Sequence, residues 1–188
     1  MDFFGNFIHQ SRYARWDSSK ERRETWTETV DRYWDWMVGK FPILGQRPDI
    51  REAILNKNIM PSMRAMMTAG EAADRDNTCT YNCSYLCLNG PQEMGELTYI
   101  LMNGTGVGFS VEESVAAKWP TIPYEITRNE EIKIEVEDSK EGWANAVKSL
   151  LEYLLDGIHP TWDVSKVRPS GERLKVFGGR ASGPQPLE

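Results

Sequence analysis

The stretch from Asn77 to Glu112 constrains the fold most, because it combines strand, helix and glycine-turn signals in a short span. Residues Tyr81 to Leu88 are typical of a buried strand, and Glu93 to Met102 are typical of a helix. A glycine turn, Gly104 to Gly108, leads into a second apolar strand over Val107 to Val111. Strand, helix and strand within about 30 residues predict a βαβ unit with a parallel pair of strands.

Outside this unit the sequence predicts three further helices and two further strands. We expect helices over 21–41, with Ser18 as N-cap, over 49–56, and from Ser139 to Gly157. Strands are expected over 133–136 and 162–167. The first fifteen residues appear irregular in the sequence, and Glu71 to Asp76 is expected to be a charged surface loop.

Composition excludes several classes of protein. The net charge of -6 argues against a broad nucleic-acid-binding face. No apolar run approaches the roughly 20 residues of a membrane helix, and the N-terminus lacks the layout of a secretory signal. Three cysteines within nine positions fit a reducing compartment better than a disulfide scaffold. We therefore expect a cytoplasmic protein without membrane or nucleic-acid partners.

The cysteines Cys79, Cys83 and Cys87 form a C-x3-C-x3-C pattern. A zinc site needs four ligands, and the two histidines, His9 and His159, are distant in the sequence. We therefore expect no metal site. Two interpretations remain open for the thiols: all three are buried structural residues, or one of them is a redox thiol, which we favour.

Two glycine-rich segments are candidate ligand loops. Gly104 to Gly108 follows a helix and precedes a strand, which is the reverse of a Rossmann fingerprint. It is either a simple tight turn or a place where the backbone approaches a ligand closely. The segment Phe177 to Gly183 has the same character, and its Arg180 could meet a base or a phosphate. Its alternative interpretation is a solvated connection.

Several motifs, taken together and in order, resemble the adenosylcobalamin-dependent (class II) ribonucleotide reductases, and among them the monomeric ribonucleoside-triphosphate reductases. The resemblance covers nearly the whole chain. The motifs are Ser11 to Trp16, Arg22 to Trp26 with Glu28 to Val30, Asn82-Cys83, Gly104 to Glu112, Val136 to Trp143, and Phe177 to Pro184.

The resemblance implies an α/β fold in which N-terminal helices are followed by the first half of a ten-stranded α/β barrel. It implies an N-terminal helical region over residues 1–58 and the half-barrel over residues 59–188, continued by a missing chain or segment. Cys83 would be one member of the redox-active thiol pair. The remaining implied sites are Ser62, Asn82 and Gly106 for substrate, Gly178, Gly179, Arg180, Ala181 and Ser182 for the specificity loop, and Asp138, Ser139 and Trp143 for the effector.

The resemblance also implies partners and cofactors. Class II reductases are several times longer, so the thiyl-forming cysteine, the redox partner of Cys83 and most cobalamin contacts are expected beyond Glu188. The chain would then be a split-gene product, an intein-interrupted piece or a truncated piece, and would act with a complementary C-terminal polypeptide. Adenosylcobalamin, a deoxynucleotide triphosphate effector and a thioredoxin-like or other dithiol reductant are implied. The substrates would be ribonucleotides, with triphosphates favoured.

An alternative function of a different class stays open. The chain could be a stand-alone regulatory module that binds a deoxynucleotide without catalysis, using the motifs around Asp138 and Arg180.

Overall fold

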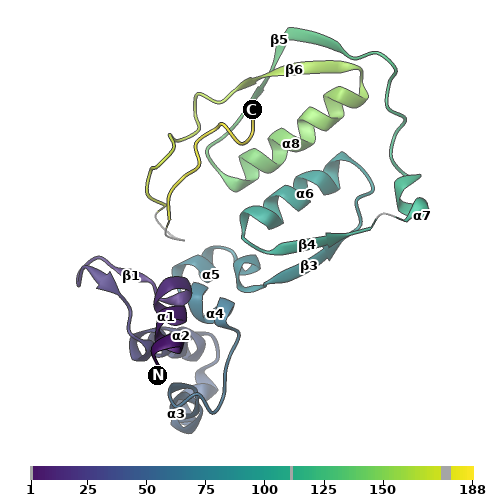
Figure 1. Ribbon diagram of the computed structural model, residues 1–188. Coiled ribbons are helices and arrows are strands. Elements are labelled where there is room, and N and C mark those ends of the chain that lie inside the picture. Colours follow the sequence, from purple (N-terminus) through teal and green to yellow (C-terminus); the bar gives the residue numbers. More distant parts are fainter. Residues whose placement is uncertain (1, 111, 175–178) are drawn as a thin grey trace. The chain divides into compact units, whose positions relative to one another are not determined.

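The computed structural model describes residues 2–110, 112–174 and 179–188, and the chain divides into two compact units. The first unit contains the residues up to Tyr81, and the second contains Asn82–Leu174 and Gly179–Glu188. Figure 1 shows the elements of each unit. The expected boundary between residues 58 and 59 stays a prediction.

The first unit is built mainly of helices. Its hydrophobic core contains Val30, Trp34, Ile54 and Met66, all of which are buried. In chain order its elements are α1 (Phe3–Ile8), a π-helix (His9–Tyr13), β1 (Trp16–Asp17), β2 (Arg22–Arg23), α2 (Trp26–Lys40), a 3-10 helix (Pro42–Gln46), α3 (Pro48–Leu55), α4 (Met63–Thr68), α5 (Glu71–Arg75) and a second 3-10 helix (Asn77–Thr80).

The long helix α2 begins later than the sequence predicted. Ser18 is not its N-cap, because that part of the chain lies in the turn between the antiparallel strands β1 and β2, where Glu21 has φ 52°. The helix instead begins after Thr25, whose hydroxyl accepts the backbone N–H of Glu28 at 3.3 Å. The Glu28 carboxylate accepts the Thr25 N–H at 2.7 Å, which completes a capping box.

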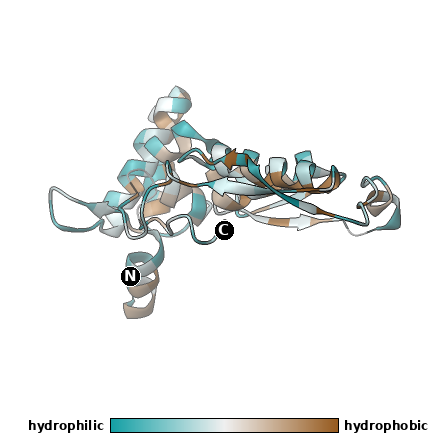
Figure 2. Cartoon of the chain, turned by 90° about the horizontal axis from the view of Figure 1, so that it is seen from above, coloured by the Kyte–Doolittle hydropathy of each residue, from teal (hydrophilic) through white to brown (hydrophobic). Residues whose placement is uncertain are grey.

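Two segments that were expected to be irregular are helical. Within the first fifteen residues, 3–13 form α1 and the π-helix, and α1 has no buried residue. In Figure 2 the helix beside the N-terminus is largely brown, in agreement with its exposed Phe3, Phe4 and Phe7. The expected charged loop at Glu71 is α5, because its small apolar side chains pack in a buried cluster with Cys79.

The second unit has mixed α/β structure. Helices α6 (Pro91–Met102) and α8 (Lys140–Leu155) pack against each other, with one parallel two-stranded sheet beside each helix (Figure 1). One sheet pairs β3 (Cys83–Leu86) with β4 (Gly106–Phe109), and the other pairs β5 (Thr127–Glu135) with β6 (Ile158–Asp163). A short helix, α7 (Glu113–Ala116), lies between the two halves in sequence.

The predicted βαβ unit is confirmed by β3, α6 and β4. The first strand is shorter than 81–88, and the expectation that it is buried is wrong. Cys83 and Tyr85 point to an exposed face, whereas Ser84 and Leu86 are half-buried on the other face. The alternation arises because only one face of this two-stranded sheet is covered within the described chain.

The second half of the unit follows the prediction in part. The helix from Ser139 is confirmed: the Ser139 hydroxyl caps α8 and Gly157 follows it with φ 77°. The strand expected at 162–167 is displaced to Ile158–Asp163, because the Asp163 carboxylate accepts the Ser165 N–H at 3.0 Å and so forms a turn that ends the strand. Among the described residues, no helix is long and apolar enough to cross a membrane.

Candidate functional site

Cys83 lies at the first position of β3, directly opposite Gly106 of β4. The N–H of Gly106 donates to the carbonyl oxygen of Asn82 at 2.9 Å, and the Ser84 hydroxyl donates to the carbonyl of Gly106 at 3.3 Å. Asn82, Cys83 and Gly106 are all exposed. The structure thus brings together three of the residues that the sequence predicted, with an accessible thiol beside a glycine backbone.

The glycine turn before β4 is held by its buried neighbours. Helix α6 ends at Met102 with Asn103 as its C-cap, Gly104 follows with φ 77°, and Thr105 is almost fully buried. The positive φ explains the glycine at 104. At Gly106 a Cβ would lie 3.6 Å from the Asn82 carbonyl, which is an ordinary contact. The protein itself therefore leaves room at Gly106, and a close ligand is one reason for a glycine there.

The other two cysteines are placed differently. Cys79 is fully buried beside the helix α5 alanines, which fits a structural thiol. Cys87 lies just after β3, with its sulfur 3.7 Å from the hydroxyl oxygens of both Tyr85 and Ser110, which bond to each other. Because Cys83 and Cys87 are four residues apart along extended chain, their Cα atoms are about 13 Å apart, too far for a disulfide.

Ser62 belongs to the first unit. Its hydroxyl is the N-cap of α4 and accepts the N–H of Ala65 at 3.3 Å. The side chain is exposed, so its capping role leaves the substrate role as a prediction.

Sequence reasoning missed the polar network that holds the C-terminal end of α4. Arg15 donates to the carbonyls of Met67 and Thr68 at 2.9 and 2.8 Å. Arg32 donates to the carbonyls of Met66 and Ala69 at 3.0 and 2.9 Å. Two guanidinium groups thus satisfy four consecutive carbonyls at a helix end that would otherwise lack partners.

The same network contains Glu24 and His9. Arg32 binds both carboxylate oxygens of Glu24 at 2.6 and 2.9 Å, and Thr29 donates to Glu24 at 3.0 Å. Burial opposes the charge of Glu24, but these bonds outweigh it and its pKa is lowered. His9 is buried with Nε2 2.9 Å from the Thr29 hydroxyl, and burial lowers its pKa. The only sequence signal was that Arg15 and Glu24 lie in motifs of the predicted family.

The described part of the predicted specificity loop pairs with residues 171–174. Gly171 and Ala181 are joined by an N–H to carbonyl bond of 2.9 Å, and Arg173 pairs with Arg180 in an antiparallel bridge. Arg180 also donates to the carbonyl of Gly171 at 2.8 Å. Gly179, Arg180 and Ser182 are exposed, and Ala181 is half-buried; Gly178 lies outside the described residues.

The three residues predicted for the effector have contacts of their own. Asp138 accepts two bonds of 2.9 Å from Arg168, which lowers the pKa of Asp138. The Ser139 hydroxyl accepts the N–H of Gly142 at 2.9 Å, and Trp143 packs against the buried cluster beside β5. Each residue therefore supports the fold locally, and its effector role stays a prediction.

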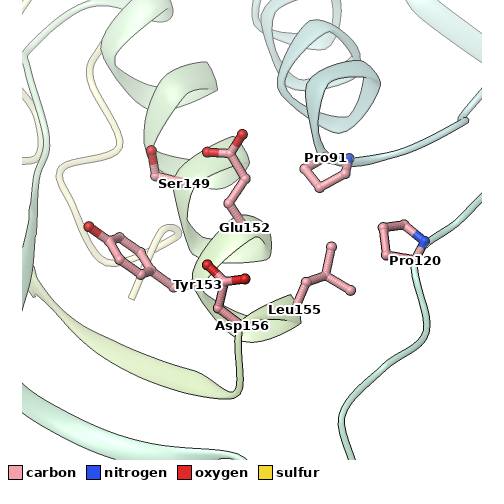
Figure 3. A pocket seen from close by; sticks show the side chains of 7 residues that line it. All are labelled: Pro91, Pro120, Ser149, Glu152, Tyr153, Leu155 and Asp156. Carbon is pink, nitrogen blue, oxygen red and sulfur yellow. The ribbon is translucent and has the colours of Figure 1, made fainter.

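Figure 3 shows an open pocket of about 640 Å³ beside the C-terminal half of α8. None of the predicted site residues lines it. Two carboxylates and two hydroxyls supply its polar side chains, and no described histidine or cationic side chain lines it. The lining residues are Pro91, Pro120, Ser149, Glu152, Tyr153, Leu155 and Asp156. Within the described residues, no group of three histidine, cysteine or acidic side chains could hold a metal ion.

Several known proteins are similar to this chain in sequence. Residues 112–188 match the family model described as the insertion domain of B12-dependent ribonucleotide reductase. A protein of Mycobacterium phage D29, named as an adenosylcobalamin-dependent ribonucleoside-triphosphate reductase, is 28% identical over 97% of this chain and 31% of its own length. The enzymes of that name from Lactobacillus acidophilus and Euglena gracilis are 26% and 25% identical, again over 97% of this chain.

A solved structure agrees with these relatives. The crystal structure of a B12-dependent (class II) ribonucleotide reductase matches 96% of this chain with a TM-score of 0.78 and 24% identity. This chain covers 35% of that structure and about a third of the length of the curated relatives. Sequence and fold thus confirm that the chain resembles the N-terminal portion of the adenosylcobalamin-dependent ribonucleotide reductases, the family that its motifs predicted.

Proposed function

We propose that this chain supplies the N-terminal part of a class II ribonucleotide reductase. Together with a complementary C-terminal polypeptide it reduces ribonucleotides, preferentially triphosphates, to deoxyribonucleotides in the cytoplasm. The observation that carries the proposal is the exposed thiol of Cys83 beside the open backbone of Gly106. The resemblance to ribonucleoside-triphosphate reductases supports the reaction class.

Cys83 is the reductant in this proposal. Reduction at the ribose 2′ carbon breaks one C–O bond and releases water, and it requires two electrons and two protons. Cys83 and a second thiol supply them and become a disulfide. Neither Cys87, which is about 13 Å away, nor the buried Cys79 fits as the second thiol. The partner cysteine therefore belongs to the C-terminal polypeptide, and a thioredoxin-like or other dithiol restores both thiols.

The C-terminal polypeptide would continue the proposed ten-stranded barrel from the edges of the β3–β4 sheet. In doing so it would cover the open face of this sheet. Tyr85 is 62% exposed there, on the same side of the strand as Cys83. A two-stranded sheet with exposed aromatics and unpaired edges is marginal by itself. Additional strands would cover these side chains and enclose the thiol.

The remaining assignments complete the proposal. Asn82, Gly106 and Ser62 contact substrate. Gly178 to Ser182 form the specificity loop, and the region of Asp138, Ser139 and Trp143 takes a deoxynucleotide triphosphate effector. Adenosylcobalamin would supply radical initiation when bound. The described residues do not fit it, because the pocket in Figure 3 is open and lined by carboxylates, so we assign its binding to the C-terminal polypeptide.

The experiment measures ribonucleotide reduction by this chain with adenosylcobalamin and a dithiol, with and without the complementary polypeptide. We expect activity only in the mixture. Cys83→Ser should abolish turnover, because serine cannot form a disulfide. Cys87→Ser is the matched control from just after the same strand and should retain activity.

Full turnover by Cys83→Ser, or equal loss in both variants, would contradict the assignment of Cys83. An inactive mixture in which dATP or dGTP raises the melting temperature of this chain would instead favour the deoxynucleotide-binding module, because a ligand that binds only the folded state stabilises it.

A further inference from the structure

The C-terminal end of α6 carries a buried polar side chain that has no role in the proposed reaction. Asn103 is fully buried. Its side-chain amide donates to the carbonyl of Tyr99 at 3.1 Å, and its side-chain oxygen accepts a hydrogen bond from the ammonium group of Lys140. Both polar ends of a buried amide are therefore satisfied, as the cost of an unpaired buried group requires.

Lys140 is an unusual residue for its position. It is the first residue of α8, immediately after the N-cap Ser139. The positive end of the helix dipole disfavours a cation there, and acidic residues are the common choice. The hydrogen bond to Asn103 is a specific interaction that explains a lysine at this position. Through it the Lys140 side chain connects the start of α8 to the C-terminal end of α6.

The bond acts on the backbone that faces Cys83. Asn103 is followed by Gly104 with φ 77° and by the buried Thr105, and then by Gly106, whose N–H donates to the Asn82 carbonyl at 2.9 Å. Only two residues, Gly104 and Thr105, thus separate Asn103 from Gly106, the residue opposite Cys83. A shift of Asn103 would be transmitted directly to Gly106.

Resting on the function proposed above, we propose that Lys140 is a positioning residue for the substrate-facing turn. Its ammonium group fixes Asn103, and Asn103 fixes the turn so that the Gly106 backbone stands beside the Cys83 thiol. Lys140 lies two residues after Asp138, which binds Arg168. The start of α8 thus contacts both the glycine turn, through Lys140, and Arg168, through Asp138.

The first test uses amide hydrogen exchange on this chain and needs no catalysis. Lys140→Met keeps the aliphatic length and removes the charge. We expect the Gly106 amide to exchange at least about tenfold faster, because the variant removes the ammonium group that binds the buried Asn103 side chain. Lys148→Met is the matched control on the same helix, where the lysine forms only a surface pair with Glu152 at 3.8 Å. In Lys140→Arg, which retains a cation, the exchange rate of the Gly106 amide should be closer to that of the natural chain than in Lys140→Met.

The proposal is overturned if Gly106 exchange is unchanged in Lys140→Met, or rises equally in Lys148→Met. It is also overturned if the amides of β5 and α8 accelerate as much as Gly106, because that result indicates general destabilisation. Equal exchange in the methionine and arginine variants would exclude a role for the charge.

The second test uses the complete enzyme formed with the C-terminal polypeptide. Lys140→Met should raise KM for the ribonucleotide more than it lowers kcat, since the thiol itself is unchanged. An unaltered KM with faster Gly106 exchange would refute the link to substrate. Absence of any reduction by the natural pair would overturn the proposed function, whereas the exchange result would still decide whether Lys140 positions the turn.

Discussion

Replacement of Arg32 by methionine is the sharpest test of how the first unit is stabilised. The guanidinium makes two bonds to Glu24 and two to the carbonyls of Met66 and Ala69, at 2.6 to 3.0 Å. The side chains of Arg32 and Glu24 are only 19% and 12% exposed. Arg32→Met would thus leave a largely buried carboxylate and two helix-end carbonyls without this donor.

The expected loss is a substantial part of the folding free energy. Removing one partner of a fully buried ion pair costs about 3–5 kcal/mol, and the partial exposure here reduces this to about 2–4 kcal/mol. The assay is urea unfolding monitored by tryptophan fluorescence. Arg22→Met is the matched control, because Arg22 bonds to Glu28 at 2.7 Å on the surface with a 45% exposed side chain. Its effect should be much smaller.

The pH dependence of the unfolding free energy gives a second, independent check of the role of Arg32. The pKa of Glu24 is lowered in the fold, so its stabilising contribution is present above its unfolded pKa, near 4.5, and is lost as the pH falls through the folded pKa. The deficit of Arg32→Met should therefore be largest near neutral pH and shrink on acidification below about 4.5. A deficit equal to that of Arg22→Met, or one independent of pH, would refute this account.

Two further predictions concern other parts of the fold. Gly142→Ala should destabilise the second unit, because the new Cβ would lie 2.7 Å from the Cβ of Glu137 and would overlap its carbonyl oxygen; thermal unfolding checks this, and an unchanged melting temperature would contradict it. Burial lowers the pKa of His9 below its ordinary value of 6.5, so the unfolded state binds the proton more readily. The unfolding free energy should fall as the pH decreases below about 6.5, and His9→Gln should remove that part of the pH dependence.

The sequence predicted the elements whose signals are local. The βαβ unit and α8 were recognised because apolar spacing, the Ser139 cap and Gly157 all lie within the element itself. The start of α2 was wrong although the pattern was right. Both Ser18-x-x-Glu21 and Thr25-x-x-Glu28 fit a capping box, and the choice between them depends on contacts outside either motif.

Those contacts show why pattern alone chose the wrong cap. The Glu28 carboxylate binds the ammonium group of Lys20 at 2.6 Å and the guanidinium of Arg22 at 2.7 Å, so a residue within the earlier candidate box and one directly after it bind the later box. The hairpin of β1 and β2 brings these cations to Glu28. The network around Arg32 could not be predicted from local patterns either, because the carbonyl partners of Arg32 are 34 and 37 residues away in the sequence. Long-range polar pairing has no periodicity to read.

The fold brings together three of the predicted site residues, but their surroundings differ from what the sequence predicted. Asn82, Cys83 and Gly106 were identified by motif, and the strand register places them together. The sequence suggested a buried strand, whereas Cys83 lies on an open face with the exposed Tyr85. A thiol that must pass electrons to a substrate and then form a disulfide needs an enclosed site and a second sulfur. The described chain offers Cys83 neither, so the same openness that the sequence failed to predict is what makes a complementary polypeptide necessary to the proposed function.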